Sequence, residues 1–336
     1  MQNVKLASIC KFKQWQTIPT KELKETGYPV WGANGIIGYT DTYNHEQPTI
    51  MICCRGATCG SINVSEGKCY INGNAMCLDD LSNDYLLDYV KYYLKHYDFS
   101  SIITGAAQPQ ITQIGLQKIL IPFKSINEQK ETVTVLTELE HLLNCKKTTL
   151  QSLDELVKSR FIEMFGYITD INGFQRKQWK ELVNITNGKD HKKISGEGPY
   201  AVYGTGGRML SAKEYMCNEN TIIMGRKGTI DKPYIVPEKC WIVDTAFGVN
   251  PQNHNILNFI YLYYYTKQID YTKLNKACTL PSTTKSDLYE LWMNVPPIEH
   301  QNTFAKFVKQ IDKSKFIALF SLKTFYVKSL HFLHLP

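Results

Sequence analysis

The sequence lacks the motifs that mark most nucleotide-using enzymes. It contains no G-x-x-x-x-G-K-[ST] phosphate loop, and Gly204-Thr205-Gly206-Gly207 lacks the third glycine and the spacing of a dinucleotide fingerprint. It has no Asn-Pro-Pro-aromatic run of the kind that amino-methyltransferases use, and no Pro-Asp precedes a Glu-x-Lys to suggest a nuclease core. We therefore predict a chain without catalytic residues and without a bound cofactor. A self-contained methyltransferase or nuclease would need a motif that is missing.

Long apolar runs are also missing. The most apolar stretch, ILNFIYLYYY at 256–265, is ten residues long, whereas a helix needs about 20 apolar residues to cross a bilayer. No apolar signal segment follows the first five residues. We predict a cytoplasmic protein that has no membrane partner.

Cysteines at metal-ligand spacing are scarce. None of the ten cysteines forms a C-x-x-C pair, although Cys53, Cys54, Cys59, Cys69 and Cys77 lie close together in the sequence. No histidine stands beside them at the spacing of a zinc site. We predict reduced thiols in the core and no metal site.

The chain does have length and a modest excess of positive charge. Its 336 residues are enough for two domains, each with its own core. The net charge of +7 favours polyanionic partners only weakly, because many proteins with this balance bind no nucleic acid.

The middle of the chain carries the pattern of one long helix. Residues 126–165 contain no proline or glycine, and apolar residues recur in steps of three and four. A helix of that length would reach about 60 Å. A second, less regular pattern begins near Glu299. We predict that the two helices pair as an antiparallel coiled coil with near two-fold symmetry, the alternative being that each packs only on its own domain. The predicted pairing residues are Leu136, Leu139, Leu143, Leu150, Leu153, Val157, Phe304, Phe307 and Ile311.

The chain also matches itself at a shift of 172 residues, which carries Tyr28 onto Tyr200. The matching segments are Tyr28–Gly32 with Tyr200–Gly204, Thr49–Ile52 with Thr221–Met224, Arg55-Gly56 with Lys227-Gly228, Gln108–Thr112 with Leu280–Thr284, and Asn127–Gln129 with Glu299–Gln301. An earlier pair, residues 6–14 and 182–190, matches at a shift of 176. A period this long indicates a tandem duplication of a domain plus a helix, since solenoid repeats are far shorter.

Within each copy, short β-branched runs between glycines, prolines and asparagines predict strands, and a tyrosine-rich segment predicts a helix. We therefore predict an α+β fold in which each domain is a curved mixed sheet with short helices. The expected order is a first domain at 1–125, a long helix at 126–166, a second domain at 167–298 and a C-terminal helix at 299–336.

Basic and polar residues in the repeated loops are the candidates for binding nucleic acid. Lysine and arginine contact phosphates, while arginine, asparagine and glutamine can pair with base edges. Each residue taken alone is more often a solvated surface side chain, and it is the placement in both copies that favours the group. The candidates are Lys11, Lys13, Arg55, Gln108, Gln110, Thr112, Lys189, His191, Lys192, Lys193, Arg208, Arg226, Lys227, Lys276, Ser282, Thr283 and Lys285.

This arrangement resembles the specificity subunit of type I restriction-modification enzymes. The resemblance rests on the glycine loops, the Arg/Lys-Gly after a strand, the Gln108–Thr112 and Leu280–Thr284 loops, and the proline before each of the Asn-Glu-Gln and Glu-His-Gln helix starts. Lys158–Gly166 is similar to the end of that family's central helix. The match covers essentially the whole chain.

The resemblance implies two target-recognition domains that each read one half of a bipartite, asymmetric site in double-stranded DNA. It also implies paired helices that set the spacing, and docking to methyltransferase subunits, two being expected, and to restriction subunits. The chain itself would be non-catalytic, while the assembled complex would be an adenine-specific methyltransferase and ATP-dependent endonuclease. S-adenosylmethionine, ATP and Mg²⁺ would then belong to the partner subunits.

Two other interpretations stay open. A non-catalytic coiled-coil adaptor that binds proteins would explain the helices and the missing motifs, but not the basic loops. An inactive specificity-subunit variant would also fit, because the tail at 321–336 loses its heptad pattern, and the first domain begins almost at Met1 without the family's longer lead.

Overall fold

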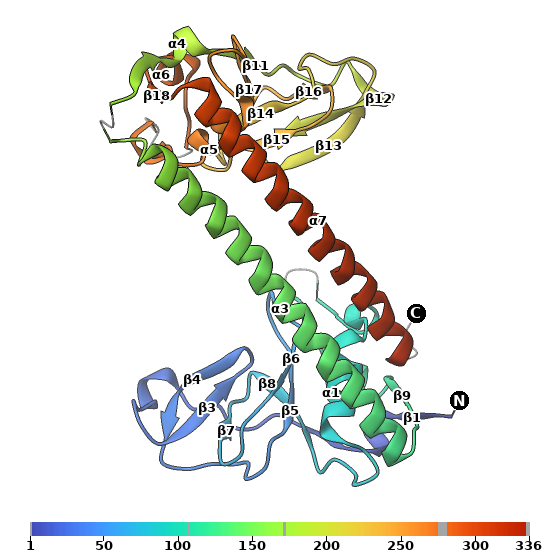
Figure 1. Ribbon diagram of the computed structural model, residues 1–336. Helices are drawn as coiled ribbons and strands as arrows, with labels where there is room; N and C mark the ends of the chain where they lie inside the picture. Colours follow the sequence, from blue (N-terminus) through green and yellow to red (C-terminus); the bar gives the residue numbers. More distant parts are fainter. Residues whose placement is uncertain (1, 106–107, 171–172, 275–280, 334–336) are drawn as a thin grey trace. The chain divides into compact units, whose positions relative to one another are not determined.

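The computed structural model describes residues 2–105, 108–170, 173–274 and 281–333, with side chains described as far as residue 319 (Figure 1). The chain divides into a first unit, Met1–Lys147 with Leu319–Pro336, and a second unit, Thr148–Ala318. Within the described residues, no helix combines the length and the apolar character needed to cross a membrane.

The first unit holds nine strands, two short helices and the start of a long helix. They are β1 (Asn3–Lys5), β2 (Lys11–Lys13), β3 (Tyr28–Gly32), β4 (Gly35–Thr40), β5 (Ile50–Cys53), β6 (Ile62–Val64), β7 (Tyr70–Ile71), β8 (Ala75–Asp79), α1 (Leu87–His96), α2 (Gln113–Leu116), β9 (Leu120–Pro122) and α3 (Ile126–Phe165).

The second unit repeats this order of strands, with the short helix α4 in addition, and its last helix, α7, continues beyond Ala318 into residues assigned to the first unit. Its elements are β10 (Gln175–Gln178), α4 (Trp179–Leu182), β11 (Val183–Asn187), β12 (Ser195–Gly204), β13 (Gly207–Ala212), β14 (Thr221–Gly225), β15 (Tyr234–Val236), β16 (Cys240–Ile242), β17 (Ala246–Pro251), α5 (Phe259–Thr266), α6 (Lys285–Tyr289), β18 (Trp292–Val295) and α7 (Ile298–Leu333).

The sheets of the two units have the same topology. A four-stranded sheet runs β2-β8-β5-β6 in the first unit and β11-β17-β14-β15 in the second. A three-stranded sheet runs β4-β3-β7 and β13-β12-β16, and its last pair is parallel in both units. The small β1-β9 and β10-β18 sheets are antiparallel. The duplication inferred from the sequence is therefore a duplication of topology.

The central strands are apolar because they are buried along their whole length. Every residue of β5 and β14 is buried, which accounts for the continuous apolar runs at these positions. The tyrosine-rich helices pack beside them, and the hydroxyls of Tyr89 and Tyr261 donate to the backbone oxygens of Pro122 and Asn294 at 3.1 and 2.8 Å. A tyrosine can join a core in this way when its hydroxyl finds a partner.

One glutamine ties each long helix to its own unit. Gln129 and Gln301 are fully buried. The Oε1 of Gln129 accepts from the backbone N–H of Leu86 and that of Gln301 from Asn258, both at 2.8 Å. Each Nε2 also donates to two backbone oxygens. The Asn-Glu-Gln and Glu-His-Gln helix starts in the sequence are thus the points at which each helix is attached to its unit.

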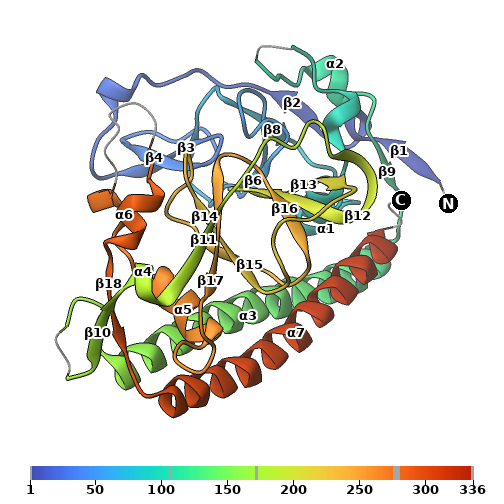
Figure 2. The ribbon, with the colours of Figure 1, turned by 90° about the horizontal axis from the view of Figure 1, so that it is seen from above.

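The two long helices are in contact within the second unit, where they lie side by side in both views (Figures 1 and 2). The Lys315 ammonium lies 2.6 Å from the Asp154 carboxylate, and the ring of Phe161 meets that of Phe304 edge-on at 5.4 Å. Early α7 residues therefore face late α3 residues, as antiparallel helices require. This confirms the predicted α+β class and the antiparallel contact of the helices.

Not all of the predicted pairing residues serve that contact. Leu136 and Leu139 belong to the core of the first unit, so this part of α3 packs on its own domain, as the alternative interpretation held. Val157 and Phe304 are buried together in the core of the second unit, with Phe307 and Ile311 packed against it. The remaining predicted residues, Leu143, Leu150 and Leu153, are half-buried.

Candidate nucleic-acid interface

Each unit carries one cation on a matched backbone bridge. Arg55 bridges Gln110, and Lys227 bridges Ser282, in antiparallel pairing outside the named strands. The next residue is a glycine in both units, with φ of +84° at Gly56 and +80° at Gly228. That left-handed conformation is rarely open to other residues, which explains the Arg/Lys-Gly motif.

The glycine N–H groups complete the two bridges. Gly56 donates to the Pro109 oxygen at 3.1 Å and Gly228 to the Pro281 oxygen at 2.9 Å. The backbone thus fixes each loop, and the side chains of Arg55 and Lys227 are exposed. A cation held at the rim of a sheet in this way can reach a phosphate or a base edge.

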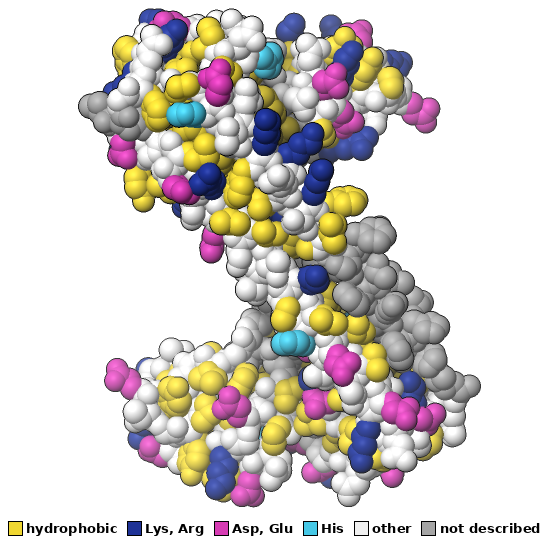
Figure 3. All heavy atoms as spheres, viewed as in Figure 1, with side chains coloured by type: hydrophobic (Ala, Val, Ile, Leu, Met, Phe, Trp, Pro, Cys, Tyr) yellow, Lys and Arg dark blue, Asp and Glu magenta, His cyan; other side chains and the backbone are white. Residues whose placement is uncertain are grey.

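An open cleft of 570 Å³ lies beside Arg55 in the first unit. The β3–β4 turn forms one wall, and the loop after β5 forms another. Figure 3 shows apolar side chains at the surface over β3 and β4, where Ile36 and Ile37 are 46% and 48% exposed. The amide, apolar and cationic side chains that line the cleft are Asn34, Ile36, Ile37, Arg55, Asn74 and Gln108.

The corresponding region of the second unit has more cationic side chains. Arg208 stands on β13 at the position of Ile36, because it pairs with Tyr203 as Ile36 pairs with Trp31. Arg208 is exposed, whereas Arg226 is half-buried and donates from Nη1 to the Asp244 oxygen at 3.4 Å. Arg208 is therefore the better placed of the two for an external ligand.

The strand pairing of Lys11 and Lys13, the two lysines of β2, gives them other counterparts in the second unit than the sequence match predicts. Lys11 pairs with Asp79 in the four-stranded sheet, and Asn184 pairs with Asn250 at the matching place in the second unit. The true shift here is 173, from Lys11 to Asn184, and not 176. Lys11 and Lys13 therefore have no basic counterparts at 188–193, which corrects the matched placement assumed from the sequence.

Both β2 lysines also have partners within the unit. The Lys11 ammonium lies 2.9 Å from the Asp80 carboxylate, and this ion pair raises the pKa of Lys11 and lowers that of Asp80. The Lys13 ammonium lies 3.4 Å from the centre of the Trp15 ring. Both remain close to the surface, so the contacts orient the charges without burying them.

The basic loop at 189–193 follows β11 in the second unit. Asp190 organises it by accepting the backbone N–H of Lys192 at 3.0 Å, and the Trp241 indole donates to the Lys189 oxygen at 3.2 Å. Lys189, Lys192 and Lys193 are exposed, and His191 is half-buried. The loop thus presents three cations on a fixed backbone.

Three further candidates make hydrogen bonds within the second or the first unit. Thr283 is buried and donates its hydroxyl to the Gly225 oxygen at 2.9 Å. The Lys285 ammonium donates to the Ile185 oxygen at 2.6 Å, as Gln113 does to the Phe12 oxygen in the first unit. Thr112 accepts the Gly115 N–H and so caps α2.

Lys276 lies outside the described residues. The loop residues Gln108 and Gln110 are exposed and Ser282 is half-buried.

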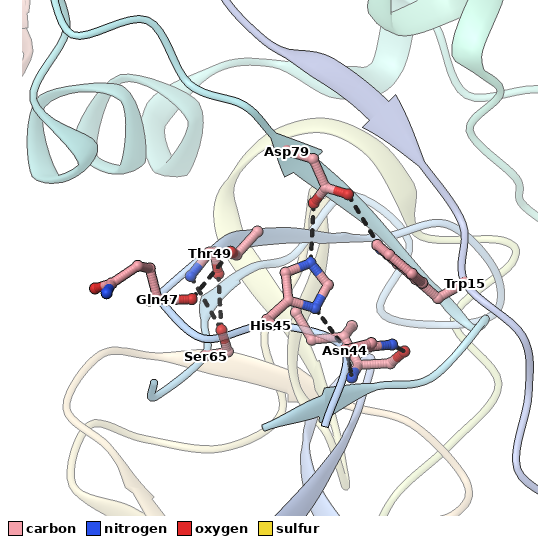
Figure 4. A network of polar contacts seen from close by, with 8 residues as sticks. Trp15, Asn44, His45, Gln47, Thr49, Ser65 and Asp79 are labelled. Carbon is pink, nitrogen blue, oxygen red and sulfur yellow. Dashed lines mark hydrogen bonds and ion pairs between the residues drawn. The ribbon is translucent and has the colours of Figure 1, made fainter. Parts of the chain in front are cut away.

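A polar network fills the interior of the first unit close to β2 (Figure 4). The His45 imidazole meets Asn44 Oδ1 at 2.7 Å through Nδ1 and Asp79 Oδ1 at 3.0 Å through Nε2. The other Asp79 oxygen accepts from the Trp15 indole at 3.1 Å. His45, Cys77 and Asp79 bring possible metal-ligand atoms within 4.8 Å of one another.

We interpret this cluster as structural. Both His45 nitrogens already have hydrogen-bond partners, and burial, followed by the charge of Asp79, raises the pKa of the Cys77 thiol and so disfavours the thiolate that a metal binds. The sequence did not reveal the cluster, because His45 and Asp79 are separated by 34 residues and come together only in the folded sheet.

The sequence also missed four cleft residues, Asn34, Ile36, Ile37 and Asn74. Uncharged residues in a glycine-rich turn give no signal by composition. The available clue for Asn34, Ile36 and Ile37 was their position, since they follow directly on the self-matching segment Tyr28–Gly32.

Comparisons with known proteins agree with this geometry. Residues 1–155 and 172–319 match the family model described as the type I restriction modification DNA specificity domain. The chain is 25% identical over 293 residues to the putative type I restriction enzyme MjaX specificity subunit of Methanocaldococcus jannaschii, covering 75% of this chain and 68% of that protein. It is 23% identical over 315 residues to the putative specificity subunit S.HindORF215P of Haemophilus influenzae, covering 85% of this chain and 79% of that protein.

Solved structures show the same fold. The S subunit of a type I restriction-modification system from M. genitalium aligns with a TM-score of 0.64 at 17% identity, covering 99% of this chain and 94% of that one. A chain from a study of complex assembly and conformational transition of the type I R-M system aligns with a TM-score of 0.58 at 12% identity, covering 99% of this chain and 96% of that one.

Proposed function

Because this chain belongs to the family of type I restriction-modification DNA specificity subunits, we propose that it directs its enzyme complex to a bipartite, asymmetric site in double-stranded DNA. Subunits of this family are non-catalytic, and the catalytic activities reside in other subunits. In our proposal the domain at 1–125 reads one half-site, and the domain at 167–298 reads the other.

The observation that carries the proposal is the pair of matched backbone bridges. In each unit a bridge holds one exposed cation, Arg55 or Lys227, beside a loop whose other side chains differ between the units. A cation at the same place in both copies suits the DNA backbone, which is the same at every sequence. Different neighbours suit the major groove, where all four base pairs can be distinguished.

We propose that the long helices set the spacing of the half-sites and dock two methyltransferase subunits and, through the assembled enzyme, restriction subunits. Apolar side chains on the helices support a protein partner: Leu142, Leu156 and Phe316 are 40%, 47% and 69% exposed. We take these exposed apolar groups as the candidates for contact with a methyltransferase subunit. S-adenosylmethionine, ATP and Mg²⁺ would be bound by those partners.

The test is methylome sequencing of cells that carry the chain with its cognate methyltransferase, compared with cells in which only this chain is deleted. New adenine methylation at a split, asymmetric motif is the expected result. Unchanged methylation together with co-purification of the methyltransferase would indicate an inactive variant. Unchanged methylation without co-purification would favour the adaptor interpretation, in which the helices bind other proteins.

The matched control is the double variant Arg55→Met with Lys227→Met. Losing one phosphate contact per unit should weaken binding to all DNA sequences alike and reduce the magnitude of the salt slope by about one per contact. A change in the recognised motif would instead assign these two residues to base reading.

A further inference from the structure

The loops beside the two bridges carry chemically different side chains in the two units. The first unit presents amides at Asn34 and Asn74 and an apolar side chain at Ile36. The matched positions in the second unit are Gly206, Thr245 and Arg208. Amides and an isoleucine are thus replaced by a glycine, a hydroxyl and an arginine.

Strand registers establish these equivalences independently of any sequence match. Ile36 and Arg208 are opposite Trp31 and Tyr203 in the same hairpin. Ala75 is opposite Cys53 as Ala246 is opposite Gly225, which places Asn74 and Thr245 at the same turn. The comparison therefore concerns residues at equivalent places in one fold.

Base edges discriminate among these side chains. Asparagine pairs with adenine through N6 and N7, and an apolar group contacts the thymine methyl, whereas arginine pairs with guanine through O6 and N7. We infer that the first unit reads an A·T half-site through Asn34, Asn74 and Ile36, and that the second unit reads a guanine-containing half-site through Arg208. This inference rests on the proposed function and specifies its ligand.

The cleft is suited to this reading. Asn34, Asn74 and Ile36 are all exposed, and they line a single open cleft together with Arg55. Arg55 and its counterpart Lys227 place a positive charge at the same position in both units, on matched backbone bridges. Their common role is contact with phosphate, which positions each unit on the duplex.

The test is selection from randomised duplex DNA by the full chain purified with its methyltransferase subunits. The unaltered complex should enrich a split motif with one A·T half and one half that contains guanine. Asn34→Ala with Asn74→Ala should lower discrimination at the A·T half by about fivefold to a hundredfold and leave the other half unchanged. Arg208→Ile should do the reverse.

A substitution that transfers chemistry between the units makes the test sharper. Ile36→Arg places an arginine where the second unit has one, so it should introduce a guanine preference into the first half-site. Asn83→Ala and Lys180→Ala are the controls, since they remove an exposed amide and an exposed cation outside these loops. Both should leave the motif intact, and circular dichroism would verify that every variant folds.

The outcomes separate this inference from the proposed function. A split motif that the variants leave unchanged, or that they weaken equally for all sequences, would overturn the base assignment while the proposed function stands. A split motif with the two base classes exchanged would do the same. Failure to enrich any motif would contradict the proposed function itself.

Discussion

In the first unit His45 and Cys69 face each other across a short backbone bridge, and in the second unit Cys217 and Cys240 occupy the matching bridge. Each pair exchanges two backbone hydrogen bonds of 2.9 to 3.0 Å. The surroundings differ, because His45 joins a polar network through Asp79, whereas the free thiols of Cys217 and Cys240 form a hydrogen bond with each other. The same backbone arrangement therefore tolerates two unrelated interiors.

The contacts at the start of each long helix, here called the helix joints, show the same combination of shared backbone bonds and different side chains. The glutamine bonds of Gln129 and Gln301 are matched, but one turn further the first helix carries Thr132 and the second carries Phe304. The Thr132 hydroxyl accepts a hydrogen bond from the Lys124 ammonium at 3.2 Å. Phe304 instead packs against the rings of Phe161, Phe165 and Tyr264. Backbone-directed bonds are common to both joints, and side-chain packing is particular to each.

The largest loss of stability is expected from a substitution in the helix joint of the second unit, at a side chain that the first unit lacks. Phe304→Ala should destabilise that unit by about 3–5 kcal/mol, because a fully buried ring is lost from an aromatic cluster. Thr132→Ala should cost the first unit about 1 kcal/mol. Hydrogen exchange read by mass spectrometry reports each unit separately. Phe304→Leu is the control, and an equal loss for Phe304→Ala and Thr132→Ala would contradict the difference between the joints.

An intermediate effect tests what the joints share. Gln129→Ala and Gln301→Ala should each cost about 2–3 kcal/mol in their own unit, because each leaves a buried backbone N–H and two backbone oxygens without the amide. Gln117→Ala removes an exposed amide and should be neutral. A response in only one unit would mean that the two joints are not energetically equivalent. The same hydrogen-exchange measurement applies.

The smallest expected effect is a difference between the two units in how their stability depends on pH. Burial raises the pKa of Cys10 and Cys54 in the first unit to about 12, from an ordinary value of 9.0. The folded state thus favours the neutral thiols. The contribution of these thiols to the free energy of unfolding is complete below pH 9 and is lost as the pH rises toward 12. The expected loss at pH 10 is roughly 1 kcal/mol per thiol.

The second unit supplies the comparison for this pH effect. The hydrogen bond between Cys217 and Cys240, together with burial, raises the pKa of Cys240, but the same hydrogen bond lowers the pKa of Cys217. The two thiols therefore oppose each other in their effect on the pH dependence of the second unit. Hydrogen exchange at pH 7 and at pH 10, corrected for the intrinsic rate, should show that the first unit loosens more. A Cys10→Ser variant with an unchanged pH response would count against this cause.

The fold was predictable where periodicity governs it. The apolar runs of β5 and β14, the tyrosine-rich helices and the unbroken pattern of α3 are local signals, and all of them correspond to observed elements. The parallel pairing of β3 with β7 was not predictable, because it joins residues about 40 positions apart with no local mark.

The site was predictable only in part. Arg55 and Lys227 stood out because a cation precedes a glycine in both copies. The internal hydrogen bonds of Thr283 and Lys285 were not predicted, because a sequence does not reveal whether a polar group faces solvent or a backbone oxygen. The cleft side chain of Asn74 comes from a turn distant in sequence from Asn34, so only the folded sheet brings the two together.

The matched bridges have a consequence for how such a chain can evolve. The hydrogen bonds that hold the Arg55 and Lys227 loops run between backbone atoms, and a backbone atom is the same whichever side chain it carries. Mutations at the neighbouring exposed positions should therefore be nearly neutral for folding. A lineage can then sample new side chains at the surface proposed to face DNA while every intermediate remains folded, so that target preference can drift without passing through unstable ancestors.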